Sequence, residues 1–167
     1  MKTYTDFYFL FSNNRTNFKT LGIAIILMVV SVVSHKVQAQ CDETAPYVEN
    51  FDGSNFNPSS PFVIDNCWDI SGTGFYEWTV GSGSTSSGDT GPSDDVTGGE
   101  EYMFTEASGG STGDISNFTS PSIDISGLTN PELRFFYHMY GADIDKLRIL
   151  VDDGSGFTEV DKIIGQV

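Results

Sequence analysis

Short runs in which apolar and polar residues alternate dominate the chain from residue 46 onward, and they constrain the fold more than any other feature. The clearest run is ELRFFYHMYG, in which two sets of side chains alternate: Leu133, Phe135, Tyr137 and Met139 against Arg134, Phe136, His138 and Tyr140. Successive side chains of a strand point to opposite faces, and both faces here carry aromatic residues. We therefore predict a central strand of a two-sheet sandwich for this run.

The other runs are separated by clusters of Gly, Ser, Asn, Asp and Pro, a spacing typical of an all-β chain. No helical period of any length appears among them. We expect further strands in PYVENF, NCWDI, FYEWTV, EYMFTEA, PSIDIS, DKLRILVDDG and FTEVDKII. The longest connection, GSGSTSSGDTGPSDD, is of a length that in compact domains is usually functional or disordered.

The N-terminal region has the pattern of an export signal. Its apolar run, LGIAIILMVVSVV, has 13 residues, fewer than the roughly 20 that span a bilayer. Basic residues precede the run, and Val37 and Ala39 suit a signal-peptidase site. We predict a signal peptide over residues 1–39, a short segment over 40–46, and a secreted or surface-located product with no membrane insertion after cleavage. A retained signal anchor and a lipoprotein acylated on Cys41 stay open as alternatives.

The charge of the exported chain restricts its partners. Cleavage after Ala39 would remove Asp6 and four of the eight basic residues, leaving 22 acidic and 4 basic residues, a formal charge of −18. Nucleic acids and anionic membranes are poor partners for such a surface. Cations, basic proteins and neutral glycans are better ones, and the frequent aromatic residues argue against disorder.

The two cysteines, Cys41 and Cys67, both lie outside the predicted signal. An even pair in an exported chain indicates one disulfide formed in an oxidising compartment. In the chain-entropy model such a crosslink stabilises the fold by roughly 3 kcal/mol. A structural zinc site is the alternative, but it needs four ligands and the exported chain adds only His138 as a further soft ligand.

Patterns that would indicate an enzyme are weak. GGSTG, from Gly109 to Gly113, matches G-x-S-x-G, but the nucleophile elbow needs a helix directly after the serine and DISNFTSPSID is not helical. Acidic pairs such as Asp94/Asp95 are too abundant to single out the two carboxylates of a glycosidase. We predict a non-enzymatic protein. Trp68 and Trp78 are either core residues or exposed platforms that stack on sugar rings.

Several segments, taken in order, resemble the MAM domain family, named from meprin, the A5 antigen and receptor tyrosine phosphatase mu. They are ENFD, CW, FYEWTVGSG, TGPSDDVTGGEEYMFTEASG and FTSPSIDISGLTNPELRFFYHMYGADIDKLRILV. The resemblance covers residues 47–167, about the first two-thirds of a MAM domain, and is closest to the bacterial form. It implies a jelly-roll-like antiparallel β-sandwich of the concanavalin A lectin type, here without its C-terminal strands. It also implies that this domain is joined to the rest of a longer polypeptide.

The resemblance also implies a function. MAM domains are extracellular, non-catalytic modules for adhesion or for holding a larger secreted protein together, so an extracellular protein or glycan is the expected partner. The alternative is a carbohydrate-binding module attached to a secreted hydrolase. Burial or exposure of Trp68 and Trp78 distinguishes the two hypotheses.

A cation site is the last expectation. The run GPSDDVTGGEE supplies the carboxylates and flexible glycines that calcium loops use, although a solvated acidic loop has the same composition. Some members of the family bind calcium or sodium, and its motifs place the ligands at Asp52 and Asp95. The family's histidine after the second acid is Val96 here, and a third family acid lies beyond residue 167. The first family disulfide corresponds to Cys41–Cys67.

Overall fold

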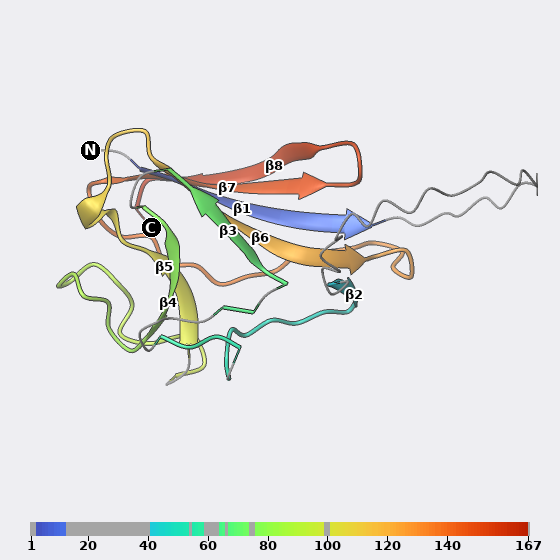
Figure 1. The fold of residues 1–167 in the computed structure, drawn as a ribbon, viewed down its shortest axis with the longest axis horizontal. Helices are drawn as coiled ribbons and strands as arrows, with labels where there is room; N and C mark the ends of the chain where they lie inside the picture. Colours follow the sequence, from blue (N-terminus) through green and yellow to red (C-terminus); the bar gives the residue numbers. More distant parts are fainter. Residues whose placement is uncertain are drawn as a thin grey trace, which may run out of the picture.

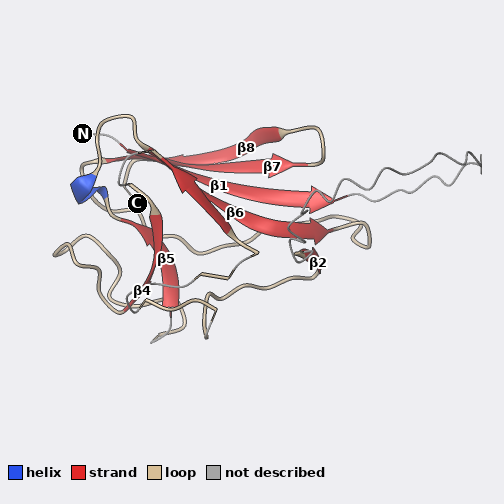
Figure 2. Ribbon diagram, viewed as in Figure 1, coloured by secondary structure: helices blue, strands red, loops and turns tan. Residues whose placement is uncertain are grey.

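The computed structural model describes residues 3–12 (backbone only), 41–53, 55–58, 64–65, 67–73, 76–98 and 101–166. Among these residues strands predominate, and the one helix is a 3-10 turn over Ala107–Gly109 (Figure 2). The strands form a larger and a smaller sheet. The predicted all-β sandwich is therefore confirmed.

The larger sheet has the order β2–β6–β1–β7–β8, and β3 also pairs with β6 (Figure 1). Its strands are β1 (Thr3–Ser12), β2 (Asp42–Thr44), β3 (Asp69–Gly72), β6 (Ile115–Asp124), β7 (Ile144–Asp152) and β8 (Phe157–Ile164). The smaller sheet is the antiparallel pair β4 (Trp78–Ser82) and β5 (Glu101–Thr105). The β3–β6 and β7–β8 pairs are also antiparallel, whereas β1 and β2 pair in parallel with their neighbours.

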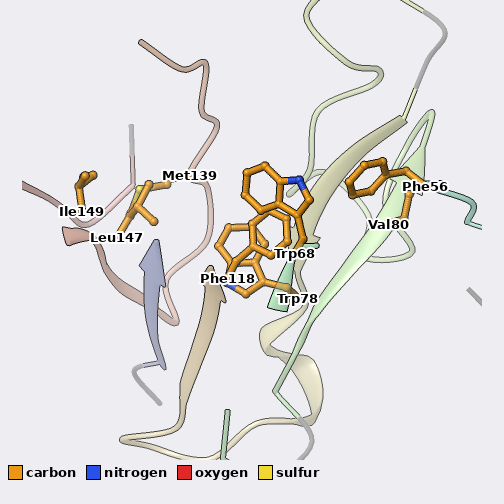
Figure 3. Close-up of a cluster of buried hydrophobic side chains, with 8 residues drawn as sticks. All are labelled: Phe56, Trp68, Trp78, Val80, Phe118, Met139, Leu147 and Ile149. Carbon is orange, nitrogen blue, oxygen red and sulfur yellow. The ribbon is translucent and has the colours of Figure 1, made fainter. Parts of the chain in front are cut away.

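The core lies between the sheets and is dominated by aromatic side chains (Figure 3). Its buried members are Phe56, Trp68, Trp78, Val80, Phe118, Met139, Leu147 and Ile149. Phe118 of β6 is fully buried, and its ring stacks on Trp68 with centroids 4.4 Å apart. Alternation explains this placement, because Ser116, Phe118 and Ser120 all face inward from β6.

Most of the predicted strands are present, with shifted ends. FTEVDKII is β8, and β7, β5 and β4 lie within or across their predicted runs. PYVENF, by contrast, is not a strand.

The prediction of a central strand in ELRFFYHMYG is wrong for this structure. Residues 131–140 are extended but join no ladder, and all of them except Met139 are exposed. The reason is that another strand occupies the expected place in the sheet. The position between β6 and β7, the strands before and after this segment, is taken by β1.

β1 comes from the segment assigned to the export signal. It pairs in parallel with β6 on one side and with β7 on the other, with Phe7 level with Phe118 and Ile149. The apolar run over 21–33 and the expected cleavage site after Ala39 lie outside the described residues. Within the described part, no helix is long and apolar enough to cross a membrane. Cleavage of residues 1–39 therefore stays a prediction.

Candidate functional site

The loop that joins β4 to β5 carries the glycine-rich acidic run singled out from the sequence. Its base is closed by the Tyr102 hydroxyl, which donates a hydrogen bond of 2.6 Å to the backbone oxygen of Gly83. Partial burial, together with the negative charge of Asp94, raises the pKa of Tyr102. The phenol therefore stays protonated and keeps its donor role while acidic groups lie beside it.

Internal hydrogen bonds shape the first half of this loop. The Thr90 hydroxyl donates to the Ser87 oxygen at 3.1 Å, and Thr85 donates to the same oxygen at 3.4 Å. Gly91 passes so close to Thr85 that an added Cβ would lie 2.1 Å from the threonine hydroxyl. Glycine is thus required at this position by space, and the segment has a defined path.

Two contacts tie the loop to other parts of the chain. The Ser87 hydroxyl lies 3.3 Å from that of Ser108, in the 3-10 turn. The Nε2 atom of His138 lies 3.2 Å from the Thr90 oxygen. Neither contact has a signal in the sequence, because each joins residues more than 20 positions apart.

The serine contact is reinforced by Glu106, which caps the 3-10 turn. Its carboxylate accepts hydrogen bonds from the backbone amide and the hydroxyl of Ser108, at 3.2 and 2.7 Å. Partial burial acts to raise the pKa of Glu106, but the hydrogen bonds from Ser108 and Ser87 outweigh it and lower the pKa.

Asp95 closes the second half of the loop. One carboxylate oxygen accepts from the Thr97 amide at 3.1 Å and from the Thr97 hydroxyl at 2.5 Å, while the other accepts from the Gly98 amide. This is the local turn that an aspartate followed by small polar residues favours. Val96, where the family has histidine, is 63% exposed and does not contribute a ligand atom.

The side chain of Asp52 contacts the first residue of β5. Its Oδ1 atom accepts a hydrogen bond of 3.2 Å from the Glu101 amide, and its Oδ2 atom accepts from the Asn50 side chain. The preceding Phe51 has a φ of 64°, a rare conformation for a bulky residue. Edge-to-face packing of Phe51 on Phe56 and Trp68, at 5.3 and 5.5 Å, fixes it there. The aromatic core thus determines the position of the carboxylate.

The two predicted ligands are related to β5 in different ways. Asp52 contacts Glu101, the first residue of β5, and Asp95 lies in the loop that leads into it. Carboxylate oxygens beside backbone carbonyls of a glycine-rich loop are chemically suited to calcium. Among the described residues, however, no group of three or more His, Cys, Asp or Glu side chains is placed to hold a metal ion.

The predicted disulfide is confirmed. Cys41 and Cys67 are bonded, with their Cα atoms 5.2 Å apart. The Cys67 amide donates to Asp65 at 2.8 Å, which fixes the turn before Trp68. The bond therefore links the segment leading into β2 to the start of β3.

The remaining sequence patterns have structural roles. Gly109 to Gly113 forms a turn, closed by a 2.7 Å bond from the Ser111 amide to Asp114, and the strand β6 follows it directly. Trp68 and Trp78 are 6% and 8% exposed, and the Trp78 indole donates to the Ser116 oxygen at 3.3 Å. Neither indole is available for stacking on a sugar ring, so the core interpretation of both residues is confirmed.

Comparison with known proteins agrees with the fold and the motifs. The family model described as "MAM domain, meprin/A5/mu" matches residues 62–164, more than half of the chain. The zebrafish protein Neuropilin-1a (Danio rerio) is 35% identical over 85 residues, which cover 50% of this chain and 9% of Neuropilin-1a. The chain thus corresponds to a small part of that relative's length. No solved structure gives a significant match.

Proposed function

Because the chain belongs to the MAM domain family, we propose that it is a secreted, non-catalytic module for adhesion or protein interaction. The match over residues 62–164 carries this proposal. Burial of both tryptophans removes the two platforms singled out from the sequence for stacking on sugar rings, which supports a protein partner over a glycan.

The distribution of charge indicates which kind of protein surface fits. Residues 41–130 contain 15 acidic residues and no Lys or Arg. The four basic residues of the exported chain each lie in an ion pair: Arg134–Glu132, Lys146–Asp145, Arg148–Glu159 and Lys162–Glu159. The acidic surface is therefore largely uncompensated, and a partner with a basic face would associate faster with it at low salt.

Adhesion is tested by binding beads coated with the protein to intact cells of its source. If the partner is a protein, protease treatment of the cells should abolish binding and glycosidase treatment should not. Binding that survives protease but is lost after glycosidase would favour the carbohydrate-binding alternative.

Export is tested on the secreted protein itself. N-terminal sequencing should begin at Gln40, because Val37 and Ala39 place the cleavage after residue 39. A full-length chain retained in the membrane would contradict secretion.

We also propose that Asp52 and Asp95 hold a calcium ion beside the start of β5. Repulsion between carboxylates brought to one place becomes attraction when a divalent cation lies between them. Only two side-chain ligands are assigned, so the affinity should fall in the weak extracellular range, with a Kd of ~10⁻⁴ to 10⁻³ M. Backbone carbonyls of the loop and water would complete the coordination.

Thermal unfolding of the full chain measures this binding. At a Kd of ~10⁻³ M, about 10 mM calcium stabilises the fold by about 1.4 kcal/mol, a rise of several degrees in Tm. Asp95→Ala should abolish the rise. Asp153→Ala is the matched control, since Asp153 caps a similar turn, between β7 and β8, by accepting from Ser155. Equal rises in both variants, or none in the native protein, would disprove the site.

A further inference from the structure

The larger sheet has one strand position for which two segments of the chain are suited. β6 and β7 both run parallel to β1, which lies between them, so β6 and β7 point in the same direction one strand apart (Figure 1). The chain must therefore return between the end of β6 and the start of β7. Residues 125–143 make this return, running back along the sheet as an extended segment without a ladder (Figure 1).

The returning segment already has the form of a middle strand of a meander. It begins with a turn in which the Leu128 amide donates to the Ile125 oxygen at 3.0 Å, and it ends with one from Ile144 to Gly141 at 3.4 Å. Between these turns, the segment 131–140 has the same length as β1, which has 10 residues. Antiparallel strands joined by short turns are the ordinary arrangement of segments consecutive in sequence, whereas parallel pairs need long crossovers.

The side chains of residues 131–140 also fit that position. Met139 is buried against Leu147 and Ile149 of β7, so one end is already packed in the core (Figure 3). Phe135 and Tyr137, on the same alternating face as Met139, are 37% and 46% exposed, and Phe136 on the other face is 82% exposed. An extended segment with this much exposed aromatic surface gains both burial and backbone hydrogen bonds by entering the sheet.

We propose that β1 and residues 131–140 are alternative occupants of the strand position between β6 and β7, and that loss of the N-terminal segment lets residues 131–140 enter it as an antiparallel strand. While β1 is part of the same chain, its effective concentration at the sheet is high. Cleavage after Ala39, which belongs to the proposed export, makes β1 a separate peptide that dilutes away. The sandwich of the exported protein then closes on its own consecutive strands.

Hydrogen exchange of uncut full-length variants tests the competition without depending on export. Phe7→Pro removes a backbone donor from the middle of β1, level with Phe118 and Ile149. In the native chain, amides 133–140 should exchange quickly. In Phe7→Pro they should exchange at least about 100-fold more slowly, as in a central strand. If they stay unprotected, or if the whole variant unfolds, the proposal is wrong.

A second variant provides the matched control. Phe136→Pro places the same change in residues 131–140 and should leave the exchange of β1, β6 and β7 in the full chain unchanged. Because either segment can fill the position, the loss of Tm in the double variant should greatly exceed the sum of the two single losses. Additive losses would show that the two segments do not compete.

Discussion

Phe118 and Phe136 are the same residue type in two alternating, aromatic-rich segments, yet their surroundings differ completely. Phe118 is 0% exposed and contacts the rings of Trp68 and Trp78, with centroids 4.4 and 5.6 Å away. Phe136 is 82% exposed. The segment around Phe118 is β6, which is paired on both edges, whereas the segment around Phe136 is paired on neither.

Aromatic composition alone therefore does not decide burial, because of these two segments only the one paired on both edges is buried along its length. A strand held in a ladder places every second side chain against the opposite sheet. In the extended segment outside the ladder, only Met139 near its end reaches the core. For residues 131–140, a strand-forming sequence is therefore not enough to reach the core while β1 occupies the position between β6 and β7.

Truncation of the two phenylalanines tests this comparison most strongly. In the full chain, Phe118→Ala should lower the free energy of unfolding by about 3–5 kcal/mol, because it leaves a cavity among the stacked rings. Phe136→Ala should change it by less than about 0.5 kcal/mol, as for an exposed residue without special contacts. Urea denaturation measures both. Equal losses in the two variants would contradict the description of the two segments.

The strand predicted most accurately from the sequence is one whose partner is near in the chain. β7 and β8 form a local hairpin, and FTEVDKII matches β8 residue for residue. The prediction of a strand failed for residues 131–140. Alternation shows that a segment can form a strand, but it does not show which segment occupies the position between β6 and β7. The sequence analysis did not predict β1 either. Its residues, TYTDFYFLFS, are strong strand formers, but their position before an apolar run indicated an export signal.

The candidate site was predictable in its residue types but not in its geometry. The acid and glycine content of the β4–β5 loop indicated a cation or a solvated loop. The position of Asp52 depends on the backbone of Phe51, with a φ of 64°, and on rings that pack against it from distant segments. The disulfide could be predicted because only two cysteines exist.

Two ion pairs allow a finer comparison of a paired and an unpaired segment. Arg148 on β7 and Glu159 on β8 meet across the ladder at 2.7 Å, and this hydrogen bond lowers the pKa of Glu159. Arg134 and Glu132 lie 2.9 Å apart on the exposed segment, where the hydrogen bond from Arg134 likewise lowers the pKa of Glu132. The second pair is two residues apart, so the unfolded chain can also form it.

A carboxyl whose pKa is lowered by folding stabilises the protein above its unfolded pKa, and this contribution is lost as the pH falls through the folded pKa. Glu159→Gln should therefore lower Tm slightly at neutral pH, and the difference from the native chain should vanish in acid. Glu132→Gln should leave Tm unchanged at every pH. Melting curves between neutral and acidic pH measure both variants, and equal effects of the two would contradict the contrast.

Intrinsic fluorescence tests most directly whether the two tryptophans, the candidate platforms for sugar rings, are buried in the sandwich. Trp68 and Trp78 are the only tryptophans of the chain, so the signal reports on these two core positions alone. Native protein should emit at shorter wavelength than unfolded protein, resist quenching by iodide and show no change when oligosaccharides are added. Emission like that of the unfolded chain, with easy quenching and a shift on adding sugar, would contradict both the buried core and the proposed function.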